Sequence, residues 1–287
     1  MKSVQCVRYG TPDVLRLVDA AKPTPKDNEL LIRVHATAVT PSDVAFRSGD
    51  PFVFRLFTGL LRPKYFPGTE LAGVVEAVGP AVNSFKPGDA VLGATGTDFG
   101  AYAEYKCLAE DGLVAHKPAN MTFGDAVHLT DGGLTSLVFL RDHARLQPGQ
   151  SILINGASGS VGAYAVQLAK YYGAVVTGVC SGPNARLVES IGADQVIDYA
   201  RQDFTRNGKT YDVIFDAVGK SSFARCAGAL KPGGIYMTTV PSLNIILQMA
   251  RTLVGDKKAV FAATGLKQRR ENLLFLTELY AVGTIPQ

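Results

Sequence analysis

The pattern of hydrophobic and polar positions changes near residue 121 of the chain. Before that point, short runs with β-branched residues are separated by turn sequences such as residues 10–13 and 86–89. Strands at this spacing are typical of a small barrel or sandwich. After that point, helical patterns alternate with short apolar runs, as in βαβ units with a parallel sheet. The pattern therefore predicts an α/β protein with a β-rich domain at 1–122 and a doubly wound, parallel-sheet domain at 123–287.

The second domain is predicted to contain six strands, which is the size of a complete dinucleotide-binding sheet. The first predicted helix places Val161, Ala165 and Leu168 on one stripe, as expected for a helix that packs on a sheet. The strands are predicted at 151–154, 174–180, 195–197, 213–216, 235–240 and 259–263. The helices are predicted at 161–172, 185–191, 223–230, 243–253 and 271–281.

Composition and charge exclude several classes of protein. Of the 287 residues, 47% are hydrophobic and 19% are charged, so the chain is too apolar and too weakly charged to be disordered. No apolar run reaches the roughly 18 residues that cross a bilayer, and the first residues lack the apolar core of a secretory signal. The net charge of +4 is spread along the chain, and its densest basic run, residues 267–270, resembles a solvated helix start. We therefore expect a cytoplasmic protein with no membrane or nucleic-acid partner.

Cysteine and histidine residues give no sign of a metal site. The four cysteines and four histidines are scattered, with no C-x-x-C motif and no pair at metal-ligand spacing. Reduced, buried cysteines of this kind are usually part of the core. We expect no bound metal.

The strongest chemical signal is the glycine-rich turn between the first strand and the first helix of the second domain. Gly159 would let the backbone approach a pyrophosphate, and Gly162 would let the helix pack close to the strand. The N–H groups at the helix start, around Ser160 and Val161, would face the negative charge. Glycine turns also occur where nothing binds, but here the strand, the helix and the following strand are all in place, which favours a dinucleotide site.

The end of the second strand favours NADPH over NADH. An NAD site places an acid there, whereas this chain has Cys180 and Ser181, and the next acid is Glu189, inside the predicted helix. Asn184 and Arg186 would accept a 2′-phosphate that a carboxylate would repel. An ordinary loop with an exposed arginine is the alternative interpretation.

With these features side by side, the chain resembles the medium-chain dehydrogenase/reductase superfamily and, more narrowly, its zinc-free quinone oxidoreductase (zeta-crystallin-like) branch. The resemblance rests on PSDVAFRSGD, PGTELAGVVEAVG, FKPGDAVLG, NGASGSVG, ADQVIDY and DVIFDAVG in combination. It implies that the first domain is a GroES-like catalytic domain and the second a Rossmann domain, with the substrate in a cleft between them. Where zinc-dependent relatives place their catalytic metal ligands, this chain has Thr40, Thr69 and Asp131, which do not form a credible zinc set.

The resemblance and the motifs together give the candidate site residues. Those expected to touch the cofactor are Thr135, Gly156, Ala157, Ser158, Gly159, Ser160, Val161, Gly162, Cys180, Ser181, Asn184, Arg186, Tyr199, Ala217, Val218, Val240 and Pro241. Those expected on the substrate side are Thr40, Asp43, Phe46 and Tyr65, with Thr40 and Tyr65 as catalytic candidates. Tyr65 is the first candidate for a hydrogen-bond donor to a carbonyl oxygen.

Three features of the first domain have alternative explanations. Asp43 can simply cap the helix that follows Thr40, and Glu70 can be a buried structural acceptor. The apolar residues 51–61, with Tyr65 and Phe66 after them, can wall a site for a flat acceptor or form an amphipathic surface helix.

We therefore expect an NADPH-dependent enzyme that transfers hydride, without metal, to a quinone or an α,β-unsaturated carbonyl. The alternatives are a reductase of another specific carbonyl and a non-catalytic NADPH-binding protein, crystallin-like or sensory. The resemblance also implies a homodimer through the region of residues 235–240. Relatives continue beyond a motif like AVGTIPQ, so we expect that a return segment of the first domain is missing after residue 287.

Overall fold

The computed structural model describes residues 1–63, 65–264 and 268–285. Residues 286–287, at the end of the predicted second domain, and Lys267, in the predicted basic run, lie outside the described residues. The described residues divide into two compact units, the first made of residues 1–131 with residues 268–281, and the second of residues 132–264 with residues 282–285. The last long helix thus groups with the first unit, whereas the sequence pattern set it in the range 123–287.

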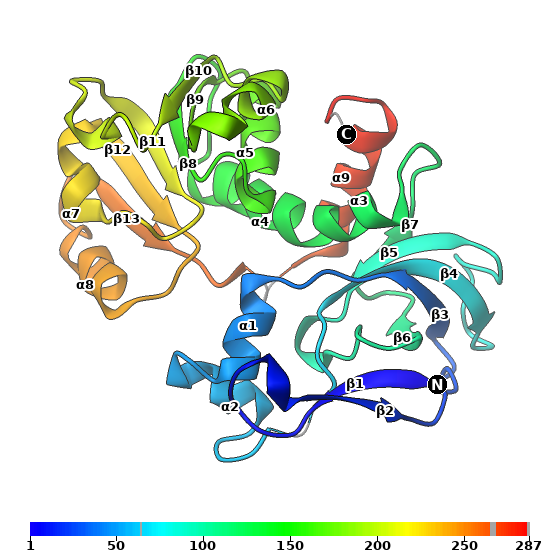
Figure 1. The fold of residues 1–287 in the computed structure, drawn as a ribbon. Helices are drawn as coiled ribbons and strands as arrows, with labels where there is room; N and C mark the ends of the chain where they lie inside the picture. Colours follow the sequence, from blue (N-terminus) through cyan, green and yellow to red (C-terminus); the bar gives the residue numbers. More distant parts are fainter. Residues whose placement is uncertain (64, 265–267, 286–287) are drawn as a thin grey trace. The chain divides into compact units, whose positions relative to one another are not determined.

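The first unit is built on a five-stranded antiparallel sheet in the order β6-β3-β4-β5-β7, with β1 and β2 paired separately (Figure 1). Helix α3 packs on β3, β4 and β5, and α9 packs on β7. The core of the sheet contains Leu30, Ile32, Leu71 and Val91, all fully buried. Its elements are β1 (Lys2–Cys6), β2 (Leu15–Asp19), β3 (Glu29–Ala36), α1 (Pro41–Ser48), α2 (Arg55–Thr58), β4 (Glu70–Val78), β5 (Ala90–Ala94), β6 (Tyr105–Ala109), β7 (Val114–His116), α3 (Phe123–His128) and α9 (Arg270–Ala281).

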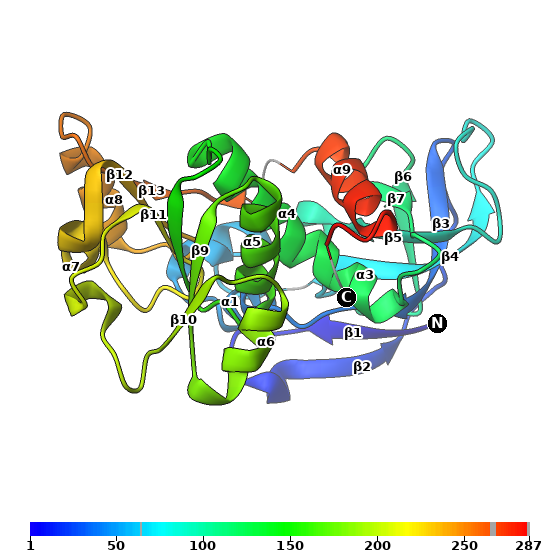
Figure 2. The ribbon, with the colours of Figure 1, turned by 90° about the horizontal axis from the view of Figure 1, so that it is seen from above.

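The second unit is a six-stranded parallel sheet in the order β10-β9-β8-β11-β12-β13. Helices α5 and α6 lie on one face of it and α7 and α8 on the other (Figures 1 and 2). The strand order reverses direction between β8 and β11, which is the point where doubly wound sheets bind ligands. Its elements are α4 (Leu134–Leu137), β8 (Ser151–Asn155), α5 (Ser160–Tyr171), β9 (Val175–Cys180), α6 (Ala185–Ser190), β10 (Gln195–Asp198), β11 (Tyr211–Asp216), α7 (Phe223–Cys226), β12 (Leu230–Thr238), α8 (Leu243–Arg251) and β13 (Lys258–Phe261).

The predicted α/β fold class is confirmed, and the differences concern element boundaries and two strands of the first unit. The helix predicted at 223–230 ends at Cys226, because a 3-10 turn at Ala227–Ala229 leads directly into β12. The strand predicted to begin at residue 235 begins at Leu230. Glycines are unusual inside strands, so the hydrophobic pattern did not indicate the first residues of this one. Strands β2 and β7 were not predicted.

A buried carboxylate fixes the end of the central strand β11. Asp216 is fully buried and accepts hydrogen bonds from Asn155 Nδ2 at 3.0 Å and from the Tyr236 hydroxyl at 3.0 Å. It also accepts backbone N–H bonds from Ser221 at 2.7 Å and, at longer distance, from Val218 and Lys220. One side chain thus joins β8, β11, β12 and the loop that follows β11.

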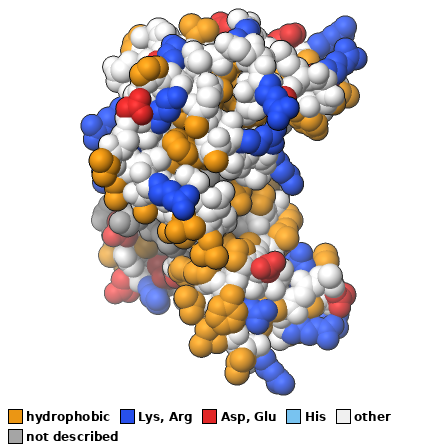
Figure 3. All heavy atoms as spheres, turned by 90° about the vertical axis from the view of Figure 1, so that its left-hand side faces the viewer, with side chains coloured by type: hydrophobic (Ala, Val, Ile, Leu, Met, Phe, Trp, Pro, Cys, Tyr) orange, Lys and Arg blue, Asp and Glu red, His pale blue; other side chains and the backbone are white. Residues whose placement is uncertain are grey.

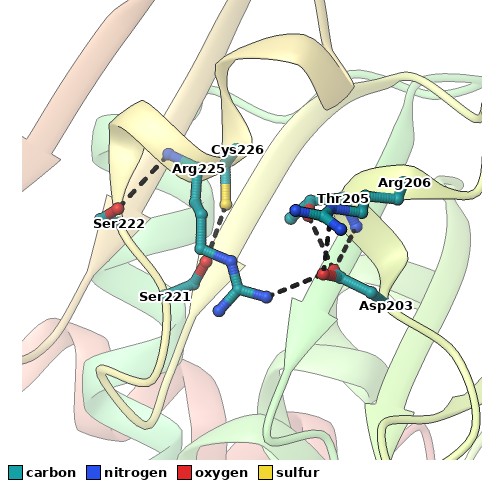
Figure 4. A network of polar contacts seen from close by, with 7 residues as sticks. All are labelled: Asp203, Thr205, Arg206, Ser221, Ser222, Arg225 and Cys226. Atoms are coloured by element: carbon teal, nitrogen blue, oxygen red, sulfur yellow. Dashed lines mark hydrogen bonds and ion pairs between the residues drawn. The ribbon is translucent and has the colours of Figure 1, made fainter.

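A second polar network lies beside this loop and is structural (Figure 4). Asp203 pairs with Arg225 at 2.9 Å, and the Thr205 hydrogen bonds, followed by Arg225, hold its pKa at about 2. Cys226 is fully buried, 3.1 Å from Ser221 Oγ, and burial raises the pKa of its thiol to about 11. Because the nucleophilic form of cysteine is the thiolate, Cys226 is a core residue and not a nucleophile.

Replacing Asp216 should destabilise the protein strongly. Asp216→Ala leaves buried donors from Asn155, Tyr236 and Ser221 without an acceptor, so we expect the free energy of unfolding to fall by about 3 kcal/mol or more. Tyr236→Phe removes one donor only and should cost about 1 kcal/mol. Urea unfolding followed by circular dichroism measures both, and a loss below about 1 kcal/mol for Asp216→Ala would contradict the assigned role.

Candidate functional site

The glycine-rich turn between β8 and α5 contains two glycines that packing alone requires. Gly156 has a φ of +86°, and a Cβ there would lie 2.4 Å from Val218 Cγ1. A Cβ on Gly162 would lie 2.1 Å from the Gly156 carbonyl oxygen. These residues let the loop after β11 and the first turn of α5 approach β8 closely.

Gly159 is different, because the fold itself does not require a glycine there. Its φ is −82°, and a Cβ would meet only the Gly156 oxygen, at 3.5 Å. Gly159 is the N-cap of α5 and has no side chain to bond the N–H groups that follow it, at Ser160 and Val161. Open space next to uncapped N–H groups at a helix N-terminus fits the pyrophosphate of a dinucleotide.

Two polar side chains predicted to contact the adenosine end, Ser181 and Asn184, lie together with Ser158 of the glycine-rich turn. Asn184 Nδ2 donates to Ser158 Oγ and to Ser181 Oγ, both at 3.2 Å. Tyr199 is 63% exposed, and its N–H donates to the Cys180 carbonyl oxygen at 3.1 Å, so it stands at the same end of the sheet. Cys180 itself is buried, which raises the pKa of its thiol.

Arg186 is exposed in the first turn of α6. It makes no ion pair among those found in the described residues, so its guanidinium is available to an anion.

Sequence reasoning missed one acid at this end of the sheet. Asp198 is the last residue of β10 and pairs in register with Cys180, and its Oδ2 would lie 2.8 Å from a Cβ on Gly182. An acid that binds the adenosine ribose is expected at the end of β9, whereas Asp198 comes from the neighbouring strand β10. Adjacency of β9 and β10 in a parallel sheet was the signal that could have found it. Arg201 lies 3.5 Å from Asp198 and partly neutralises its charge.

The loops after β11 and β12 complete the same edge of the sheet. Val218 lies against Gly156, and a Cβ on Gly219 would lie 2.6 Å from Val240 Cγ2. The Ala217 N–H donates to the Asn155 carbonyl oxygen at 3.1 Å, which ties this loop to β8. A pocket in this unit is lined in part by Gly219, Thr238 and Val240.

Thr135, in α4, belongs to the same unit. Its Oγ1 lies 3.2 Å from Thr264 Oγ1, and the neighbouring Ser136 hydroxyl donates to the Val161 carbonyl oxygen at 2.7 Å. The second unit therefore gathers the predicted residues of the turn, the adenosine end and the later loops at the carboxyl ends of its strands. Pro241 follows Val240 in this edge, and contact of each residue with a cofactor stays a prediction.

In the first unit, Thr40 and Asp43 form a helix cap. The Thr40 N–H and Oγ1 donate to Asp43 Oδ2 at 2.9 and 2.8 Å, and the Asp43 N–H donates back to Thr40 Oγ1 at 3.3 Å. This reciprocal capping box satisfies the start of α1. Asp43 therefore caps α1, as the alternative explanation states. A role of Thr40 or Asp43 in contacting the substrate remains a separate prediction.

Phe46 and Tyr65 belong to an aromatic cluster. The Phe46 ring makes edge contacts with Phe54, Phe57 and Phe99, with centroids 4.9, 6.1 and 4.8 Å apart, and Tyr65 contacts Phe99 at 5.1 Å. The Tyr65 hydroxyl is buried, and among the described residues it finds no partner with hydrogen-bond geometry. Burial, followed by the nearby Cys6 and Asp43, raises its pKa well above the ordinary value, so Tyr65 keeps its proton and can donate it in a hydrogen bond.

A group of carboxyl side chains surrounds Glu70 at the start of β4. Thr69 Oγ1 donates to Glu70 Oε1 at 2.7 Å, while the buried Oε2 has no partner among the described residues. Burial, followed by repulsion from Asp131, raises the pKa of Glu70 to about 8. Burial and Asp43 likewise raise the pKa of Asp131.

The residues that the resemblance places at zinc-ligand positions are two hydroxyls, Thr40 and Thr69, and the carboxyl of Asp131. Zinc prefers thiolate and imidazole ligands, so this donor set does not fit it. Across residues 1–63, 65–264 and 268–285, no group of three or more histidine, cysteine or acidic residues could hold a metal ion.

Comparison with known proteins assigns the chain to a family. The family described as "Alcohol dehydrogenase GroES-like domain" matches residues 26–119, and that described as "Zinc-binding dehydrogenase" matches residues 160–275. The chloroplastic quinone-oxidoreductase QR1 of Triphysaria versicolor is 32% identical over 99% of this chain and 88% of its own length. The chain belongs to the quinone oxidoreductase branch of the medium-chain dehydrogenase/reductase superfamily.

Solved structures agree with this membership. The quinone oxidoreductase from Coxiella burnetii superposes with a TM-score of 0.88 at 30% identity, covering 99% of this chain and 89% of that one. The Escherichia coli quinone oxidoreductase complexed with NADPH has a TM-score of 0.83 at 28% identity, covering 100% and 90%. The predicted GroES-like and Rossmann fold is confirmed for this quinone oxidoreductase homologue, and its general class is that of an oxidoreductase.

A negative charge at Gly159 should block the nucleotide site. Gly159→Asp places a carboxylate beside the N–H groups of α5, so we expect the affinity for a nicotinamide dinucleotide to fall by at least about 100-fold. Gly124→Asp is the matched control, because Gly124 is also exposed in the first turn of a helix and has similar free space. Fluorescence titration measures binding, and unchanged affinity of Gly159→Asp would disprove the assignment of the turn.

Glu70 should make stability depend on pH. Its folded pKa of about 8 exceeds the ordinary 4.5, so between these values the folded state binds the extra proton and stability falls as pH rises. Relative to Glu70→Gln, the wild type should lose up to about 1.4 kcal/mol of unfolding free energy per pH unit between about pH 5 and 8. Urea unfolding of both proteins at several pH values tests this, and parallel profiles would contradict it.

Proposed function

We propose that the protein is an NADPH-dependent reductase that transfers hydride, without a metal, to a quinone or an α,β-unsaturated carbonyl compound. The observation that carries the proposal is the open, uncapped N-terminus of α5 at Gly159, where the fold leaves room that packing does not need. Bound reduced nicotinamide would supply the hydride. Membership of the quinone oxidoreductase branch supports a conjugated acceptor, which spreads the developing negative charge without metal assistance.

The chain's own residues would bind and orient the two reactants. The N–H groups of Ser160 and Val161 would hold the pyrophosphate, and Val218 and Val240 would shield one edge of the cofactor from water. Ser181, Asn184 and Arg186 would receive the 2′-phosphate, with Arg186 as the cation. Tyr65, which keeps its proton, would donate a hydrogen bond to an acceptor carbonyl oxygen.

Turnover with two cofactors and two acceptors tests the proposal. We expect oxidation of NADPH, faster than that of NADH, with an ortho-quinone or a medium-chain 2-alkenal, followed by absorbance of the reduced nicotinamide. The better acceptor identifies the substrate class. Tight NADPH binding without oxidation by either acceptor would instead support a non-catalytic NADPH-binding protein.

Arg186→Ala provides the control for cofactor preference. Loss of one charge-assisted contact on an exposed site should raise the KM for NADPH by about 10-fold and leave the KM for NADH unchanged. Equal changes for both cofactors would show that Arg186 does not contact the 2′-phosphate. In that case, the preference would have to come from Ser181 and Asn184.

A further inference from the structure

The proposed hydride transfer assigns no role to an exposed apolar segment of the first unit, which the sequence also allows as a wall of the acceptor site. We call residues 51–62 the apolar loop; it contains a 3-10 turn at Phe52–Phe54, α2 and the turn after it. Phe52 is 61% exposed, Leu56 65% and Leu61 89%. Figure 3 shows hydrophobic side chains gathered on the lower part of one face, with Lys, Arg and a few Asp or Glu side chains among them. Such a continuous exposed apolar segment marks an interaction surface.

Contacts with the rest of the first unit hold the inner side of the apolar loop in place, so its other side chains stay exposed to solvent. Phe54 and Phe57 pack edge-on against Phe46. The Tyr9 hydroxyl shares a hydrogen bond of 2.8 Å with Thr58 Oγ1 and also bonds the Gly59 carbonyl oxygen. These contacts separate an anchored inner side from an exposed outer side.

The charges of this segment are all positive. No acidic residue occurs between Asp50 and Glu70, whereas the sequence there contains Arg55, Arg62 and Lys64. Arg62 is exposed, and Arg55 lies over the Tyr9 ring, 4.5 Å from its centroid. Exposed aromatic and leucine side chains with flanking cations are the composition of segments that lie in a membrane interface.

We propose that the apolar loop docks the protein on the surface of a bilayer that contains anionic phospholipids. Phe52, Leu56 and Leu61 would enter the boundary between headgroups and acyl chains, and Arg62 would extend to the phosphates. The contact is interfacial, since α2 has only four residues and no helix among the described residues is long and apolar enough to cross a bilayer. This proposal departs from the expectation that the protein has no membrane partner.

The charge pattern favours a lipid surface over a second copy of this chain. Two copies that met through this loop would bring together the cations of both segments, with the adjoining Asp50 as the only carboxylate of residues 50–69 in each copy to pair with them. The proposal concerns a surface and is independent of the reductase activity.

Vesicle flotation of the full chain tests the proposal directly. We expect binding to vesicles of phosphatidylcholine with phosphatidylglycerol, weaker binding to phosphatidylcholine alone, and release by salt. Leu61→Asp and Leu56→Asp should each reduce binding by at least about 10-fold, because each removes a large apolar side chain from the lipid. Arg62→Glu should weaken binding to the anionic vesicles most.

A matched control uses the other exposed apolar helix, α8. Leu247 is 55% exposed, so Leu247→Asp makes the same change of charge on a different surface and should leave vesicle binding unchanged. Circular dichroism checks that each variant folds. Absence of wild-type binding, or equal loss with Leu247→Asp, would overturn the proposal. So would a change of mass in solution for Leu61→Asp without vesicle binding by the wild type, which would identify the loop as a subunit interface.

Discussion

A single buried carboxylate organises the ligand-binding edge of the second unit. Asp216 receives hydrogen bonds from Asn155 of β8, from Tyr236 of β12 and from the backbone of the loop after β11. Each of these donors loses its hydrogen bonds to water on burial, and the Asp216 carboxylate accepts a hydrogen bond from each of them instead. The positions of Val218 and Gly219 therefore follow from Asp216, and the packing of Val218 against Gly156 carries the same constraint to the glycine-rich turn.

The first unit uses its polar groups differently. Thr40 and Asp43 form hydrogen bonds with each other at the start of α1. Tyr65 and Glu70, in contrast, each have a buried oxygen with no hydrogen-bond partner among the described residues. Buried polar atoms left unsatisfied cost stability, and those that lie next to a candidate site can be satisfied by a bound ligand. The groups with unused capacity are therefore better candidates for substrate contact than the paired ones.

Regular periodicity and glycine chemistry made the Rossmann unit predictable from sequence. The strand before Gly156 and the helix that begins at Ser160 can be identified locally, because the close approach at Gly156 and Gly162 leaves no space for a side chain. Asp198 and Asp216 could not be assigned in this way, since their roles depend on neighbouring strands and on donors up to 61 residues away. The grouping of α9 with the first unit has the same origin, because its partner β7 lies more than a hundred residues earlier in the chain.

The hydrogen bonds of Asn184 link two loops that recognise different parts of a dinucleotide. Ser158 belongs to the phosphate-binding turn and Ser181 to the loop after β9, and one amide donates to both. An engineer who exchanged Asn184 to alter cofactor choice would also release the restraint on Ser158, so selectivity and tightness of binding are coupled design variables in this protein.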